Sequence, residues 1–235
     1  MAHEEAIGHG LAALAQFFVG DATVRETLDR VAELAVASLP GADLAGITMV
    51  VDGKPATAVF TDRQSPDIDS AQYRTGEGPC VDAWAGRHVN RIDSMTTDGR
   101  WPAFAAACLD HGVLSTLSVP LVVKHESLGA LNFYAHRESA FGPSDEEAGR
   151  AFATQAAIVL ANTQAYWDAR GLAENLTQAM ATRAVIEQAK GILMAAGGRT
   201  PDQAFALLVQ ASQRDNRKLR DIAAEIVADA AAGSP

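Results

Sequence analysis

The chain has few of the residues that cross-link small folds or bind metals. Only two of its 235 residues are cysteines, Cys80 and Cys108. A disulfide framework needs more cysteines than this, and a structural zinc ion takes about four ligands. We therefore predict two free thiols and no metal site.

Long hydrophobic runs are also missing. No apolar stretch reaches the roughly 18 residues of a membrane span, and the N-terminal "MAHEEAIGHG" is acidic, unlike a secretion signal. The composition, 48% hydrophobic and 20% charged, is typical of a folded globular protein. We expect a cytoplasmic protein without a membrane span.

Positive charge is scarce, since the net charge is −10. Taken whole, this argues against a nucleic-acid-binding protein. The charge is unevenly distributed, however: residues 172–235 carry seven Lys and Arg against seven Asp and Glu, so the entire excess of acid lies in residues 1–171. Such asymmetry indicates two parts with separate functions.

The first part alternates between helical and strand patterns. Residues 5–18 and 21–38 have helical spacing, whereas "LAGITMVV", "KPATAVF", "STLSVPLVV" and "SLGALNFYAH" have the character of strands. Asp52-Gly53 and the polar stretch 124–126 mark hairpin turns. This pattern predicts an α+β domain with helices flanking an antiparallel sheet.

A long connection, residues 61–112, separates the two hairpins. Connections of this length are uncommon in compact domains unless they carry function. We expect it to cover a binding pocket.

From Ser144 onward the pattern is helical only. Ser144 and Glu147 form a potential capping box. Apolar residues then follow at three- and four-residue steps for about fifty residues, which is typical of a dimerising coiled coil. The alternative is two helices broken near Gly171. The seam positions include Ala165, Ala169, Leu172, Leu176, Ala179, Ile186 and Leu193.

Two shorter helices follow the Gly197-Gly198 breaker. Thr200, Pro201 and Gln203 have the types and spacing of a helix start, with Thr200 as the N-cap. A last helix is predicted from Leu219 to about residue 230. With the end of the long helix, these make a small all-α bundle.

One face of the long helix carries Arg183, Glu187 and Lys190 at spacings of four and three. The neighbouring Gly191 costs about 0.5 to 1 kcal/mol in a helix interior, which suggests close docking there. The alternative is a solvated face on which Glu187 pairs with Arg183.

The string "IEQAKGILM", followed by "DQAFALLVQAS" and "NRKLRDIAAEIV", resembles the ANTAR domain of bacterial transcription antiterminators over about residues 176–230. The resemblance implies a three-helix RNA-binding unit that acts as a homodimer and holds paired stem-loops in a messenger leader. Residues 189–191 match the family's Ala-Lys-Gly run. On the chemistry of phosphate binding, we add further basic residues to Lys190 and Gly191 and expect them to converge on one face: Arg183, Arg214, Arg217, Lys218 and Arg220.

No aromatic platform for bases is predicted in this part. Phe205 is its only aromatic residue, and we assign it to the core.

The first part, over about residues 5–165, resembles the GAF domain through "YRTGEGPCVDAW", "DGRWPAFAAAC", "GVLSTLSVPLVV" and "AFGPSDEEAGRAFATQAAIVLAN". Members of this family are sensors, so a small-molecule ligand is an open option, but the resemblance identifies neither ligand nor cofactor. The isolated residues His88, His111 and His136 lack metal-ligand spacing. We expect a sensor at 5–165, a coiled-coil connector at 166–182 and an RNA-binding domain at 183–230.

Two other functions remain. Three-helix units also serve in DNA-binding regulators, although the basic residues here do not follow one recognition helix. Some proteins of the GAF fold are thiol-dependent methionine sulfoxide reductases, but neither cysteine has an evident catalytic partner. We expect no enzymatic activity.

Overall fold

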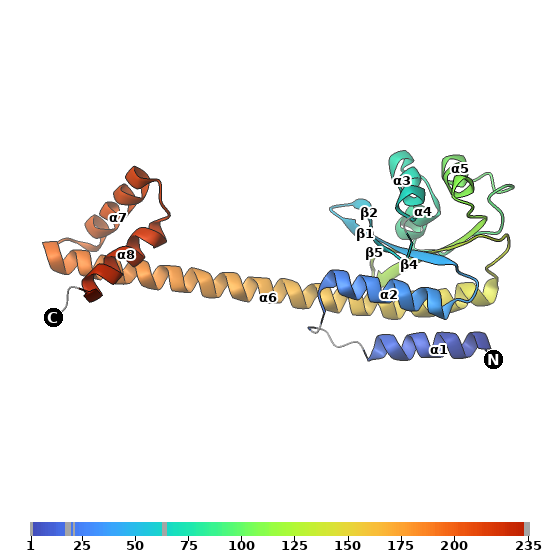
Figure 1. Cartoon of the computed structure of the whole chain (residues 1–235), viewed down its shortest axis with the longest axis horizontal. Coiled ribbons are helices and arrows are strands. Elements are labelled where there is room, and N and C mark those ends of the chain that lie inside the picture. The colour runs from blue at the N-terminus through green and yellow to red at the C-terminus, as the bar shows by residue number, and fades with distance from the viewer. Residues whose placement is uncertain (1, 17–19, 21, 63–64, 233–235) are drawn as a thin grey trace. The chain divides into compact units, whose positions relative to one another are not determined.

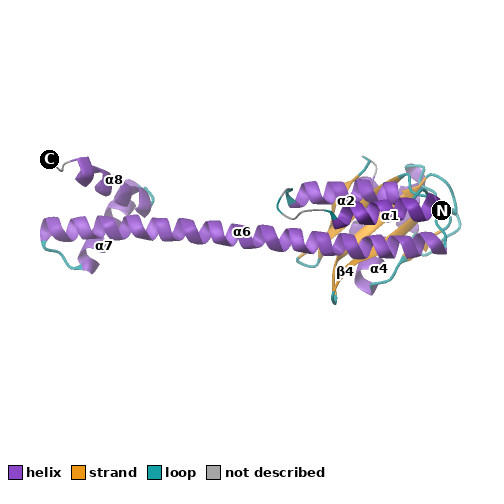
Figure 2. Cartoon of the chain, turned by 90° about the horizontal axis from the view of Figure 1, so that it is seen from below, coloured by secondary structure: helices purple, strands orange, loops and turns teal. Residues whose placement is uncertain are grey.

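A computed structural model of the chain describes residues 2–16, 20, 22–62 and 65–232. The chain divides into two compact units, Met1–Trp167 and Asp168–Pro235. Among the described residues, all strands belong to the first unit and the second is helical (Figures 1 and 2). This division agrees with the α+β and all-α parts predicted from the sequence.

The first unit is built on one antiparallel sheet. Its strands are β1 (Leu44–Val51), β2 (Lys54–Phe60), β3 (Asn90–Ile92), β4 (Ser115–Val123) and β5 (Glu126–Ala135). They lie in the order β2-β1-β5-β4-β3. The two predicted hairpins are therefore neighbours, joined by pairing of β1 with β5.

Both hairpins have tight turns. Asp52 and Gly53 have φ angles of 51° and 74°, which suit the right-handed twist of the flanking strands. Lys124 has a φ of 55° in the second turn. The strands close at Val51 with Lys54 and at Val123 with Glu126, which confirms both predicted hairpins.

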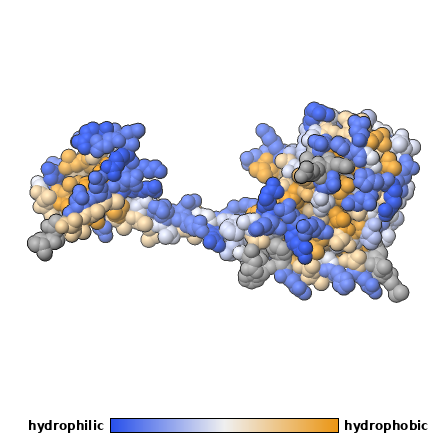
Figure 3. Space-filling model, viewed as in Figure 1, coloured by the Kyte–Doolittle hydropathy of each residue, from blue (hydrophilic) through white to orange (hydrophobic). Residues whose placement is uncertain are grey.

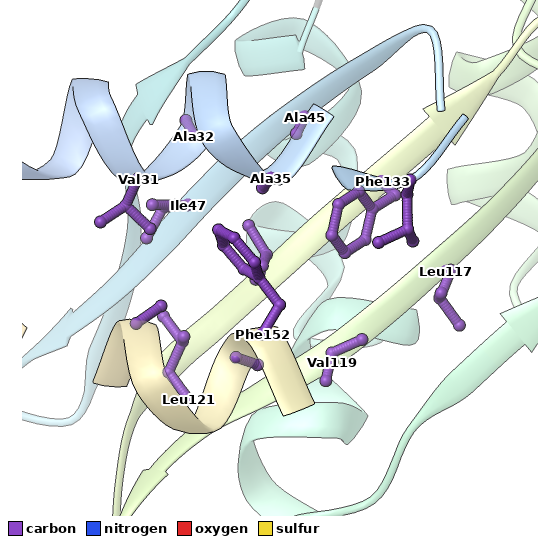
Figure 4. Packing of buried hydrophobic residues seen from close by; sticks show 14 of the residues in the cluster. Val31, Ala32, Ala35, Ala45, Ile47, Leu117, Val119, Leu121, Phe133 and Phe152 are labelled. Carbon is purple, nitrogen blue, oxygen red and sulfur yellow. The ribbon is translucent and has the colours of Figure 1, made fainter. Parts of the chain in front are cut away.

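One face of the sheet is covered by α2 (Val24–Ser38) and the start of α6 (Pro143–Gly197), with α1 (Ala2–Ala15) packed outside them (Figure 1). Phe152 of α6 lies between α2 and the strands, close to Ala35 and Val119 (Figure 4). Small residues allow α6 to approach the sheet closely. A Cβ added to Gly149 would lie only 3.1 Å from Val119 Cγ2, so a larger residue there would crowd the strand.

The opposite face is covered by the segment that the sequence presented as a long connection. It forms α3 (Ser65–Thr75), α4 (Pro79–Gly86) and α5 (Pro102–Asp110) and contributes β3. The sequence patterns indicate no helix in this segment. These elements bury a second apolar cluster that includes Ile68, Phe104 and Tyr134. This segment therefore forms a layer of the fold, and parts of it line two grooves, one at Trp84 and one at Trp101.

The helix α6 is continuous over 55 residues, so the alternative of a break at Gly171 is wrong. Its start also differs from the predicted capping box at Ser144. The helix begins at Pro143, and the Gly142 backbone N–H donates to Asp145 Oδ2 at 2.8 Å. The carboxylate of Asp145 therefore satisfies an N–H that precedes the helix.

In the second unit, α7 (Pro201–Asp215) and α8 (Leu219–Ala232) pack with the end of α6. The predicted capping box of α7 is present, with the Thr200 hydroxyl accepting from the Gln203 N–H at 3.3 Å and the Gln203 side chain accepting from the Thr200 N–H. The centre of the bundle consists of small and medium side chains: Ala189, Ala204, Leu208, Ile222 and Ala223.

Candidate functional site

A buried polar cluster lies in the first unit, between the sheet and α3. Its centre is Asp69, which is fully buried. The Asp69 carboxyl accepts hydrogen bonds from the Tyr134 hydroxyl at 2.5 Å, the Thr57 hydroxyl at 2.8 Å and the Gln72 amide at 3.0 Å. Residues far apart in the sequence thus meet around one carboxyl.

A second group of polar side chains extends the cluster. The Thr48 hydroxyl lies 2.7 Å from the Tyr73 hydroxyl, and it accepts from the Cys80 thiol and the Asn132 amide, both at 3.1 Å. Tyr73 also lies 2.9 Å from the Thr57 hydroxyl, which joins this group to Asp69. The interior under α3 and α4 is therefore polar and closely connected.

Burial dominates the titration of this cluster. It raises the pKa of Asp69 above its usual value, even though the hydrogen bonds from Tyr134, Thr57 and Gln72 act in the opposite direction. Burial likewise raises the pKa of Tyr134. Burial of a carboxyl away from any cation disfavours its ionised form, because the charge loses its hydration without gaining a partner.

Two buried polar atoms of this region have no hydrogen-bond partner among the described residues, Asn132 Oδ1 and Thr116 Oγ1. Unsatisfied buried groups are rare in native folds, and an unseen water or ligand is one of their usual causes. Sequence patterns did not reveal this cluster, because its members are single polar residues scattered over strands and helices.

In the second unit, Lys190 is more enclosed than the sequence suggested. Its side chain is 17% exposed. The ammonium lies 3.0 and 2.9 Å from the two carboxylate oxygens of Glu187 and 6.0 Å from the centroid of the Phe205 ring. The ion pair of Glu187 is thus made with Lys190, and not with Arg183 as in the alternative interpretation of this face.

The other basic residues fall into two groups. Three pair with nearby acids: Arg214 with Asp215 at 2.7 Å, Arg217 with Glu225 at 2.7 Å, and Arg220 with Asp221 at 3.3 Å. Arg183 and Lys218 are exposed, and neither forms an ion pair with a residue that the structure describes. These two cations are available without breaking an existing pair.

Gly191 is exposed on α6. A Cβ added there would meet no atom within 4 Å beyond its own helix, within the described part of the chain. The glycine is therefore not needed for packing inside this unit.

Phe205 was assigned to the core, and this was wrong. The residue is 42% exposed, whereas its neighbour Ala204 is buried. It lies on the side of α7 that contacts Lys190. Hydrophobic residues at the surface of the second unit are visible in Figure 3.

The basic residues do not all share one face. Arg214 lies nine residues after Phe205 on α7, and this spacing of about 2.5 turns puts the two on opposite sides of the helix. Arg214 lines a separate groove of about 450 Å³ with Leu207 and Ile226. The expected convergence therefore fails for Arg214.

Comparison with known protein families matches the two structural units to two different families. The GAF domain is matched over residues 21–161, more than half of the chain. The chain belongs to the GAF domain family. An ANTAR domain is matched over residues 174–227. At the level of these families, a GAF domain followed by an ANTAR domain makes a sensor-regulated RNA-binding antitermination regulator.

Solved structures resemble the chain mainly in fold. A GAF domain structure has a TM-score of 0.55 and 16% identity, covering 67% of this chain and 88% of its own. The free methionine-R-sulfoxide reductase of Neisseria meningitidis, solved with its substrate, has a TM-score of 0.54 and 15% identity, covering 70% and 91%. The GAF domain of an Acinetobacter phosphoenolpyruvate-protein phosphotransferase has a TM-score of 0.52 and 12% identity, covering 69% and 94%. A search of curated proteins found no match.

At 15% identity, the likeness to a reductase shows the GAF fold alone. Both cysteines are free, as predicted, and both are buried. Burial raises the pKa of Cys80 to about 12 and also raises that of Cys108. Reactive cysteines are accessible and have lowered pKa values, so these thiols lack the character of nucleophiles.

In the described part of the chain, no three His, Cys, Asp or Glu side chains are grouped so that they could hold a metal ion. None of the helices described is long and apolar enough to cross a membrane.

The raised pKa of Asp69 predicts a pH dependence of the GAF domain's stability. Because the folded-state pKa lies above the unfolded one, the protonated carboxyl stabilises the fold fully below about pH 4. This contribution is lost as the pH rises toward the folded-state pKa, by about 1.4 kcal/mol per pH unit. We expect the wild type to lose stability with rising pH relative to Asp69→Asn.

The measurement is urea unfolding at several pH values, followed by tryptophan fluorescence, since Trp84, Trp101 and Trp167 all lie in the first unit. Asp67→Asn, at an exposed position of α3, is the matched control and should follow the wild type. A constant difference between Asp69→Asn and wild type would contradict the assignment.

Proposed function

We propose that this protein is a signal-responsive antitermination regulator whose ANTAR domain binds paired stem-loops in messenger leader RNA. Holding such hairpins would prevent a competing terminator from forming. The proposal is carried by one observation above all: the ANTAR domain follows a GAF sensor domain in the same chain. Exposed Arg183 and Lys218, without ion pairs to described residues, support binding to phosphates.

The proposed RNA surface is the part of α6 around Gly191, together with the basic residues of the ANTAR domain. Gly191 offers open space at its Cα, so an RNA backbone can approach this helix closely. Arg183 and Lys190, seven residues apart, lie about two turns from each other on one side of α6. Arg217 and Lys218 of the α7–α8 turn and Arg220 of α8 would add contacts, whereas Arg214 lies on the other side of α7.

We further propose that the protein acts as a homodimer. Leu172, Leu176 and Met180 follow one another at four-residue intervals on α6 and are 71%, 60% and 66% exposed. Large apolar side chains exposed in such a row are typical of an unpaired coiled-coil seam. A second copy of this helix would cover them, and two ANTAR domains would suit two adjacent hairpins.

The GAF domain would supply the signal. We propose that a small molecule is sensed there and that the domain performs no catalysis, in keeping with its buried, unreactive thiols. The polar cluster around Asp69 and Asn132 has the hydrogen-bonding capacity that a polar ligand needs.

DNA is the alternative ligand. It is less well supported, because the basic residues are distributed over α6, α7, the α7–α8 turn and α8 instead of following one recognition helix. Sequencing the nucleic acid that copurifies with the full-length protein tests the proposal. Enrichment of leader RNAs with adjacent hairpins supports it, and enrichment of duplex DNA overturns it.

Close approach of RNA to α6 predicts that one of two similar alanine substitutions weakens RNA binding and the other does not. Both Gly191→Ala and Gly171→Ala add a methyl group into open space on α6, so each should stabilise its helix by about 0.5 to 1 kcal/mol. Only Gly191→Ala should weaken binding to the copurified leader RNA, transcribed as a twin-hairpin probe. Equal affinities of the two variants would remove Gly191 from the surface.

Substitutions of Lys190 and Glu187 should change RNA affinity in opposite directions. Lys190→Ala should weaken binding and reduce the slope of log affinity against log salt by about 0.7 if the contacted strand is single. Glu187→Gln should strengthen binding, because it frees the ammonium from its carboxylate. Melting temperatures should change little, since a partly exposed ion pair contributes about 0.2 to 1 kcal/mol. Early melting of Lys190→Ala with unchanged binding would make Lys190 a packing residue.

The exposed seam predicts that polar substitutions weaken the dimer. The double variant Leu172→Asp with Leu176→Asp should sediment as a monomer under conditions in which the wild type is a dimer. Burial of each leucine side chain contributes about 1.5 to 3 kcal/mol to association. Thr177→Asp, at an exposed position of α6 outside the row, controls for the added charge and should leave the dimer intact. A monomeric wild type at micromolar concentration would disprove the seam.

A further inference from the structure

Phe205 is exposed although it belongs to a well-formed helix. Its ring is 42% accessible, beside the fully buried Ala204. In the GAF domain, Phe104, Phe133 and Phe152 are at most 1% exposed, whereas Phe60 at the end of the edge strand β2 is 41% exposed. Packing of the second unit likewise leaves the Phe205 ring largely accessible, so the ring is available to bind a partner at the surface.

The ring lines a groove of about 470 Å³ between α7 and α6. The α6 side chains of this groove differ in chemistry along about three turns of the helix. Near the ring are Ile186, Arg183 and Glu187, and farther along are the amides of Asn175 and Gln178. Lys190 adds an ammonium 6.0 Å from the ring centroid.

These groups together match the parts of an unpaired nucleotide. A base has a flat face that stacks on an aromatic ring and an edge that hydrogen-bonds to amides, and its phosphate attracts arginine and lysine. Unstacked loop bases are also the part of a hairpin that proteins recognise most often.

We propose that this groove binds one unpaired loop base of the RNA, stacked on Phe205. The inference rests on the proposed RNA binding of the ANTAR domain and extends it, since it assigns a base-binding role to a residue of α7. Arg183 and Lys190 contact the phosphates that flank this base.

A second copy of the chain is a less suitable occupant. The residues around Phe205 include Arg183, Glu187 and Lys190, and a dry helix seam would have to desolvate all three. The apolar row at Leu172 and Leu176 offers a seam without that cost.

The helix provides a matched control two residues away. Leu207 is 37% exposed, similar to Phe205. Two residues correspond to a rotation of about 200° around α7, and Leu207 lines the groove of Arg214 instead. Removing Leu207 therefore tests exposed apolar surface on the other side of the same helix.

The experiment measures binding of full-length variants to the twin-hairpin probe, with dimerisation and melting followed in parallel. Phe205→Ala and Phe205→Leu should weaken binding about 5- to 150-fold, the range of one base stack. Phe205→Tyr keeps the stacking face and should bind within about threefold of wild type. Leu207→Ala should bind as the wild type does.

Abasic substitutions in the loops identify the stacked base. An abasic substitution at one loop position should weaken RNA binding by the wild type by a similar factor. The same substitution should not weaken binding by Phe205→Ala any further. Wild-type affinity of Phe205→Leu, or additive losses at every abasic position, overturns the stack while RNA binding stands. Loss of the dimer in Phe205→Leu assigns the ring to the protomer interface and also overturns it. A wild type that does not bind the probe refutes the proposed function itself.

Discussion

Close packing of helices through alanine and glycine supports both units. In the GAF domain, Gly149, Ala153 and Ala156 bring α6 against the sheet, and Phe152 fills the space beside them. In the ANTAR domain, Ala189, Ala204 and Ala223 are fully buried at the helix contacts. A core of such small side chains has little room for an aromatic ring, so Phe205 lies at the margin. The same packing that holds the bundle together thus leaves a ring exposed beside two cations.

Much of the architecture could be predicted because its signals are local. Asp52-Gly53 requires positive φ angles and fixes a hairpin, and Thr200 with Gln203 fixes the start of a helix. The region between the hairpins could not be predicted. Its helices are short, and they are stabilised by contacts such as the burial of Ile68 and Phe104 that no local pattern reveals. The correct family assignment compensated for this, since it rested on the order of several motifs.

The candidate sites likewise include some residues that local spacing predicts and others that only the fold brings together. Arg183 and Lys190 were recognisable from their spacing on one helix, but their partners were not, because the choice of Lys190 by Glu187 depends on side-chain rotamers. Phe205 was misassigned because it directly follows the buried Ala204 on the helix. Helical periodicity indicates which side of a helix is buried, but not how far around the helix the buried side extends. The Asp69 cluster was invisible, since it joins single residues of β1, β2, β5, α3 and α4. Structural likeness to a reductase identifies the fold alone, because a fold hosts many functions.

The pairing of cations with neighbouring acids has a consequence for the kinetics of recognition. Residues 172–235 carry equal numbers of basic and acidic side chains, and Arg214, Arg217 and Arg220 each contact a carboxylate. At distances beyond a Debye length of about 8 Å, such pairs act as dipoles and attract a polyanion weakly. Electrostatic steering therefore adds little to the association rate of this domain with any RNA. Under the proposed function, discrimination between transcripts would then come from how slowly the correct one dissociates.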